Sequence, residues 1–141
     1  MATRTARTAW TGSLAEGSGE VTLASSGVGT FPVSFPKRAA DDADGTTSPE
    51  ELIAAALTSC YAMQFSALLG QAGGNPKNLD VTAEVDLAPD PEGGFHIPGI
   101  RLTVTGSADG LDDADFRRIA QEAKATCPVS KALAGTTITL A

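Results

Sequence analysis

The chain has 141 residues with 42% hydrophobic and 19% charged side chains, which is the composition of one globular domain spanning residues 1–141. Its net charge of −7 would repel nucleic-acid phosphates and anionic membrane surfaces. No apolar run is expected to reach the length of a membrane span, and no apolar stretch or cleavage site follows the basic N-terminus. We therefore expect a cytoplasmic protein with neither nucleic acid nor a membrane as a partner.

The first third of the chain is predicted to form β-strands. Small or apolar residues alternate with polar ones from Arg4 to Trp10 and from Glu20 to Leu23, and the glycines between them indicate a hairpin or meander. Thr30 to Phe35 is a third candidate strand, and the prolines within and after it confine it to an edge. The stretch from Arg38 to Thr47 is typical of an exposed loop.

The strongest helix signal begins at Ser48. Ser48 suits the N-cap, Pro49 suits the first helical position, and Glu51 completes a capping box. The helix is expected to end before Gly73. Apolar or small residues cover almost its whole circumference, which predicts burial on most sides. In a chain of this size, such burial indicates a second subunit.

Two further strands and two helices complete the predicted fold. Residues alternate again over Leu79–Leu87 and Ile100–Thr105, and an amphipathic helix is expected from about Asp112 to Thr126. Pro128 begins a short helix that runs to Ala134, and Thr136–Leu140 is a last strand. This order of elements predicts an α+β fold with sheet packed on the long helix.

The chemistry of the chain is expected to lie with its two cysteines. Without a secretory signal, two thiols suggest redox chemistry before a structural staple. Cys60 lies about eleven residues into its helix, beyond the useful reach of the helix dipole, so a cation would have to activate it. Arg38, beside Lys37, is the candidate. The alternative is that Cys60 is a buried free cysteine that acts as a small hydrophobic residue.

Cys127 presents the opposite case. Because it precedes Pro128, it could cap the following helix and have its thiolate stabilised by that helix's free N–H groups. Helix electrostatics alone therefore favour Cys127 as the more acidic thiol. The alternative is a hydrophobic residue that caps the end of the preceding helix.

The segments around both cysteines resemble one known family. Thr47 to Cys60 (TSPEELIAAALTSC) is similar to the first-cysteine segment of the OsmC family of osmotically induced and organic-hydroperoxide-resistance proteins, and Ala123 to Ser130 (AKATCPVS) is similar to the second-cysteine segment. The resemblance extends over essentially the whole chain and is closer to the osmotically induced branch. It implies antiparallel sheets packed on a long central helix, in an intertwined homodimer.

The resemblance also implies a cysteine-based peroxidase that reduces organic hydroperoxides, with hydrogen peroxide as an additional candidate substrate. Cys60 would be the peroxidatic thiol and Cys127 the resolving thiol, while Arg38 and Glu50 would hold and activate the site. The implied cycle runs through a Cys60 sulfenic acid and a Cys60–Cys127 disulfide, reset by a lipoyl or thioredoxin-like dithiol. This assignment replaces the electrostatic preference for Cys127 as the attacking thiol.

Helix geometry separates two of these residues. Glu50 and Cys60 are ten residues apart, which places their backbones about 15 Å apart on one helix. We therefore expect Glu50 of one subunit to serve Cys60 of the other across a two-fold axis. In a second interpretation, Glu50 is only a first-turn acid that stabilises the helix dipole.

Cofactors and metals have no support in the sequence. His96 and the two cysteines give at most three N/S ligands, and their spacing in the sequence does not indicate a common metal site. No Gly-rich nucleotide-binding motif is present. The larger aromatic residues are predicted to be core rather than ligand-stacking residues: Trp10, Phe31, Phe35, Phe65 and Phe95. A non-catalytic thiol redox sensor and a small hydrophobic-ligand binding module remain as alternative functions, and a purely structural disulfide as a third, disfavoured by the cytosolic context.

Overall fold

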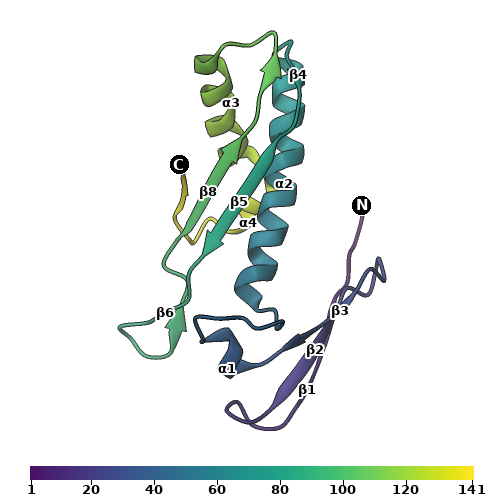
Figure 1. Ribbon diagram of the computed structural model, residues 1–141, viewed down its shortest axis with the longest axis vertical. Helices are drawn as coiled ribbons and strands as arrows, with labels where there is room; N and C mark the ends of the chain where they lie inside the picture. The colour runs from purple at the N-terminus through teal and green to yellow at the C-terminus, as the bar shows by residue number, and fades with distance from the viewer. The chain divides into compact units, whose positions relative to one another are not determined.

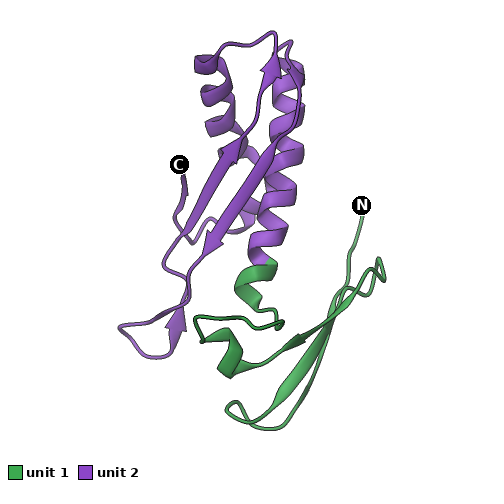
Figure 2. Ribbon diagram, viewed as in Figure 1, with its two compact units in different colours: residues 1–52 green, residues 53–141 purple.

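The structure, a computed structural model that describes residues 1–141, divides into two compact units, Met1–Leu52 and Ile53–Ala141 (Figures 1 and 2). Each unit has a three-stranded sheet of its own. The long helix α2 (Pro49–Gln71) begins in the first unit and continues in the second. The α+β class is confirmed, whereas a single domain stays a prediction.

The first unit is built on an antiparallel sheet with the strand order β1 (Arg7–Thr11), β2 (Ser18–Thr22), β3 (Thr30–Val33). The predicted meander and the edge position of the third strand are confirmed. The third strand is shorter than predicted because the Ser34 side chain caps a short helix, α1 (Phe35–Arg38), by accepting the Lys37 N–H. Arg38 therefore ends a helix, where the sequence predicted a loop.

The start of α2 differs in one detail from the predicted capping box. Ser48 Oγ accepts the Glu51 N–H at 3.1 Å, as predicted, but the Glu51 carboxylate accepts the Thr47 hydroxyl at 2.5 Å. Only the Ser48 half of the capping box is therefore formed, because the Glu51 side chain binds the Thr47 hydroxyl instead of the Ser48 N–H. The helix ends before Gly73, whose φ of +84° lies in the left-handed region that favours glycine at a helix C-terminus.

The second unit contains a sheet with the order β10 (Ile138–Leu140), β8 (Ile100–Thr105), β5 (Asp80–Val85). β5 pairs with β8 antiparallel, while β10 pairs with β8 in parallel. The helix α3 (Asp113–Thr126) agrees with the predicted one, and α4 (Pro128–Ala132) begins as predicted but ends two residues earlier.

Two small strand pairs in the second unit were not predicted from the sequence. β4 (Asn75–Pro76) pairs with β9 (Ala108–Asp109), and β6 (Ala88–Pro89) pairs with β7 (Phe95–His96), both antiparallel. Strands of two residues carry no alternation of apolar and polar side chains, so the sequence offers no signal for them.

The core of the second unit lies where α2 and α3 meet the sheet, and β5 and β8 run along α2 (Figure 1). From Leu57 onwards, one side chain in each turn of α2 is fully buried, and these residues are Leu57, Tyr61, Phe65 and Leu69. They contact Ile100 and Leu102 of β8 and the buried face of α3 in one cluster. This stripe fixes the rotation of α2 about its own axis.

The rest of α2 is less buried in the single chain than its composition predicted. Its small and apolar residues Ala55, Ala56, Ser59 and Ala67 are exposed, and Met63 is 73% exposed. Contrary to the sequence-based expectation, α2 is also long and apolar enough to cross a membrane, with a mean hydropathy of 1.6. The core helix of a soluble protein meets the same criterion.

Candidate active site

The two cysteines meet in the second unit. Cys60 lies on α2, next to the buried stripe, and Cys127 lies between α3 and α4. Their Sγ atoms are 2.6 Å apart, and both thiols are free. Cys127 is fully buried, whereas Cys60 is partly accessible. Two residues 67 positions apart in the sequence therefore form one thiol pair.

Local chain geometry fixes the position of Cys127. Its N–H donates to Ala123 O at 3.0 Å and closes α3, while its own carbonyl accepts the Lys131 N–H at 3.0 Å and opens α4. Pro128 stands at the first position of α4, where its missing N–H costs nothing. The predicted position of Cys127 between two helices is confirmed.

The surroundings of Cys127 favour its thiolate. Burial acts to raise the pKa of Cys127, but the hydrogen bond with Cys60 and the donors of Ser130 and Val129 together lower it below its ordinary value. Burial raises the pKa of Cys60, and its hydrogen bond with Cys127 raises it further. Within this pair the more acidic thiol is Cys127, in agreement with the helix electrostatics inferred from the sequence.

Ser130 is a site residue that the sequence motif contained but did not single out. It is only 8% exposed, and its hydroxyl makes no hydrogen bond to any group other than the Cys127 sulfur. In a capping box the third helical residue reaches back to the N-cap N–H, but the Cys127 N–H is already bound to Ala123 O. The Ser130 hydroxyl is therefore left to act on the Cys127 sulfur, where it favours the thiolate.

A second pair of predicted residues meets in the first unit. Arg38 Nε lies 3.1 Å from both carboxylate oxygens of Glu50, and Arg38 Nη2 lies 2.7 Å from Oε1. Glu50 is 6% exposed and the Arg38 side chain 33%. The hydrogen bonds to Glu50 raise the pKa of Arg38, while its burial acts in the opposite direction. Glu50 is thus a buried partner of Arg38 as well as a first-turn acid.

Lys37 is engaged elsewhere. Its Nζ lies 2.9 Å from Asp44 Oδ2 in an ion pair that is exposed on both sides. Of the two neighbouring cations, only Arg38 is held by a buried carboxylate. This arrangement favours Arg38 over Lys37 as the functional cation of the first unit.

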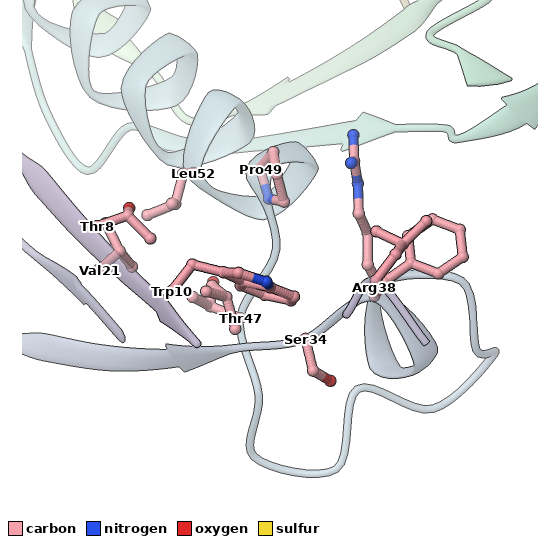
Figure 3. A pocket seen from close by; sticks show the side chains of 11 residues that line it. Thr8, Trp10, Val21, Ser34, Arg38, Thr47, Pro49 and Leu52 are labelled. Carbon is pink, nitrogen blue, oxygen red and sulfur yellow. The ribbon is translucent and has the colours of Figure 1, made fainter. Parts of the chain in front are cut away.

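An apolar pocket of about 400 Å³ adjoins Arg38 in the first unit (Figure 3). The Trp10 ring lies beside Thr47 on one side, and Pro49 and Leu52 close it with the first turn of α2. Trp10 is 43% exposed, so the prediction that it belongs to a core is wrong. Phe31 and Phe95 are exposed as well, whereas Phe65 is fully buried as predicted.

The four predicted site residues thus form two pairs, with Arg38 and Glu50 in the first unit and Cys60 and Cys127 in the second. No group of three or more His, Cys, Asp or Glu side chains is placed to hold a metal ion. The chemistry of the chain rests on a thiol pair and on a guanidinium held by a carboxylate. Free thiols of this kind are nucleophiles and reductants.

Comparison with known proteins identifies close relatives of the chain. The family model described as OsmC-like protein matches residues 41–141. The chain is 39% identical to peroxiredoxin OsmC of Escherichia coli (strain K12) over 124 residues, 88% of this chain and 85% of that protein. It is 32% identical to organic hydroperoxide resistance protein-like 1 of Staphylococcus saprophyticus over 95 residues, 67% of this chain and 66% of that protein.

Solved structures show the same fold. The organic hydroperoxide resistance protein OhrB of Bacillus subtilis is similar with a TM-score of 0.74 and 28% identity, covering 96% of both chains. An organic hydroperoxide resistance protein of Elizabethkingia anophelis gives a TM-score of 0.78 and 26% identity, covering 99% of this chain and 94% of that chain.

The position of the Ser130 hydroxyl leads to a prediction for the pKa of Cys127. In a Cys60→Ser background, which isolates the second thiol, Ser130→Ala should raise the pKa of Cys127 because a donor to the thiolate is lost. The measurement is the pH dependence of thiolate absorbance, with Ser107→Ala, an exposed serine of the same unit, as the control. An unchanged titration in Ser130→Ala would remove this hydroxyl from the site.

Proposed function

Because the chain belongs to the OsmC-like protein family and is a cysteine-based peroxidase, we propose that Cys60 attacks the peroxide and Cys127 resolves the product. The observation that carries this proposal is the contact of the two free thiols at 2.6 Å. The proposed substrates are organic hydroperoxides and, in addition, hydrogen peroxide. The names of the curated and solved relatives support the organic class.

The proposed reaction follows from thiol chemistry. The Cys60 thiolate attacks one peroxide oxygen, the O–O bond breaks, and the leaving alkoxide takes a proton to become an alcohol. Cys60 is then a sulfenic acid, which Cys127 converts to a disulfide with release of water. A dithiol of the lipoyl or thioredoxin type returns both thiols by disulfide exchange. The partial accessibility of Cys60 and the full burial of Cys127 support this division of roles.

Cys60 needs an activating group for this role. Its pKa is raised in the thiol pair, so the neutral thiol dominates unless a cation stabilises the thiolate. We assign this task to Arg38. Its hydrogen bonds to Glu50 use Nε and Nη2, which leaves the donors of Nη1 for a thiolate or a peroxide oxygen. Glu50 fixes the plane of the guanidinium, which is its proposed role in the site.

The site is proposed to be shared between two subunits of an intertwined homodimer. Ten residues separate Glu50 from Cys60, too far for their side chains to meet along one straight helix. The exposed small residues of α2 and the exposed Met63 supply an apolar face on which a second copy of the helix can pack closely. A two-fold axis beside this face would give two identical sites at one interface.

Sustained peroxide consumption is the experiment that tests the function. Purified protein with excess dithiol should consume an alkyl hydroperoxide continuously, and the rate with hydrogen peroxide gives its preference. A redox sensor would form the same disulfide without sustained turnover. The chain, like its peroxiredoxin relatives, is a non-membrane protein, and we place it in the cytoplasm, where dithiol reductants keep thiols reduced.

The two thiols are predicted to fail in different ways when they are replaced. Cys60→Ser should abolish turnover, because no sulfenic acid can form. Cys127→Ser should complete one round of peroxide reduction and leave a sulfenic acid on Cys60 that dimedone traps. The measurement is rapid-quench mass spectrometry with one equivalent of peroxide. Loss of the first round in Cys127→Ser, together with its retention in Cys60→Ser, would reverse the two roles.

Replacing Arg38 should weaken the activation of Cys60. Arg38→Ala is expected to raise the apparent pKa of Cys60 and to slow its oxidation at neutral pH, because the thiolate loses its cation. Arg38→Lys should restore little, since an ammonium lacks the planar fork that Glu50 holds. The pH profile of Cys60 alkylation reports both effects, with Lys37→Ala as the matched neighbouring control. An identical profile in Arg38→Ala would exclude Arg38 from the site.

Subunit mixing tests the shared site. The Glu50→Ala and Cys60→Ser proteins should each be inactive, and co-refolding should give heterodimers in which one site carries both lesions and the other carries neither. Activity should therefore return to about half of the wild-type value per heterodimer. A fully active monomer, or verified heterodimers without recovered activity, would contradict the shared arrangement.

A further inference from the structure

A side-chain hydrogen bond joins the two segments that carry the thiols. Gln64 Nε2 on α2 donates to Thr126 Oγ1, the last residue of α3, at 2.9 Å. Gln64 follows Cys60 by one helical turn, so the two lie on the same side of α2. Thr126 directly precedes Cys127. The bridge therefore lies one turn from one thiol and one residue from the other.

The donor and the acceptor of the Gln64–Thr126 hydrogen bond are fixed by the neighbouring bonds. Thr126 Oγ1 donates its single proton to Glu122 O at 2.8 Å, so it can only accept from Gln64. The amide nitrogen is the only donor in the Gln64 side chain, which fixes the orientation of that amide. The Gln64–Thr126 bond is partly buried. A bridge of this kind holds the end of α3 at a defined distance from α2.

The main-chain bonds of Cys127 do not tie it to α2; only its thiol reaches that helix, at Cys60. Its N–H binds Ala123 O and its carbonyl accepts the Lys131 N–H, so both bonds run along α3 and α4. The backbone of Cys127, with φ −58° and ψ 126°, is not helical, so α3 ends and α4 begins at this residue. The lateral position of Cys127 against Cys60 therefore depends on side-chain contacts between α2 and the end of α3.

We propose that the Gln64–Thr126 bridge positions Cys127 for the resolving step and so determines whether the Cys60 sulfenic acid becomes a disulfide or is oxidised further. This inference rests on the proposed function. Gln64 and Thr126 are positioning residues in this scheme, because they act through Cys127 and touch neither the peroxide nor the reacting sulfur atoms.

Two reactions compete for the sulfenic acid. In the resolving step the Cys127 thiolate attacks the Cys60 sulfur, the S–S bond forms, the S–O bond breaks, and the hydroxide leaves as water with the proton that Cys127 released. In the competing step a second hydroperoxide molecule transfers an oxygen atom to Cys60, which gives a sulfinic acid and an alcohol. A displaced Cys127 slows only the first reaction.

Two isosteric variants test the bridge. Gln64→Met keeps the length of the side chain without its donor, and Thr126→Val keeps the shape without the hydroxyl. In each variant the rate of disulfide formation should fall roughly tenfold, since a small displacement of reacting groups carries a large penalty in rate. The first oxidation of Cys60 by tert-butyl hydroperoxide should keep its rate. The sulfinic acid formed per turnover, counted by mass spectrometry, should rise by the same factor.

Three controls separate positioning from a general loss of stability. Tyr61→Phe removes the other hydrogen bond between α2 and α3, from the Tyr61 hydroxyl to Ala120 O at 2.9 Å, two turns before Cys127. It should lower the melting temperature without changing the partition between disulfide and sulfinic acid. Thr126→Ser keeps the hydroxyl and should retain the wild-type partition. The double variant Gln64→Met/Thr126→Val should behave like either single variant, because both remove one interaction.

The outcomes distinguish this inference from the proposed function. A wild-type protein that cycles through the disulfide, with both isosteric variants keeping its partition, would overturn the bridge alone. A shift of equal size in Tyr61→Phe would also overturn it, because the effect would then follow stability. A wild-type protein that forms neither the sulfenic acid nor the disulfide would overturn the proposed function and this inference together.

Discussion

The burial of one stripe of α2 is the constraint on which the thiol pair depends. Leu57, Tyr61 and Phe65 are fully buried against β8 and α3, and each contributes the free energy of removing a large apolar side chain from water, about 1.5–3 kcal/mol for a residue such as leucine. Because these residues follow one another at intervals of one turn, α2 cannot rotate without exposing them. Cys60 stands directly before Tyr61, so the same stripe sets the direction of its thiol.

The two pairs of proposed site residues are held by different physical means. In the thiol pair, burial acts to raise both pKa values, but for Cys127 the hydrogen bond with Cys60 and the donors at the start of α4 outweigh it, so that its pKa is lowered while that of Cys60 stays raised. The Arg38–Glu50 pair relies on a buried carboxylate that fixes the plane of a cation. A peroxidase that attacks with Cys60 needs both, since the thiol pair alone favours ionisation of the wrong sulfur.

Most of the fold followed from local signals, and the exceptions have physical causes. The strand at Ile100–Thr105 and the helix that Ser48 caps were predicted closely, because side-chain alternation and capping are short-range effects. The helix at Phe35–Arg38 was missed because its serine cap lay inside an apparent strand. The thiol contact could not be derived from spacing; only the resemblance of both motifs to one family indicated it. The Gln64–Thr126 bridge joins residues 62 positions apart, and no local sequence pattern predicts such a contact.

The position of Cys127 between two helices has a consequence for the dynamics of the protein. Its N–H completes the last turn of α3 and its carbonyl opens the first turn of α4, so its main chain cannot shift without disturbing an amide hydrogen bond of one helix or the other. Side-chain rotation alone leaves both helices intact. Any larger displacement, such as one that would expose the proposed Cys60–Cys127 disulfide to a bulky reductant, requires local opening of this junction. Amide hydrogen exchange at Cys127 and Lys131 would then report how often this junction opens and lets solvent reach a sulfur atom that is otherwise fully buried.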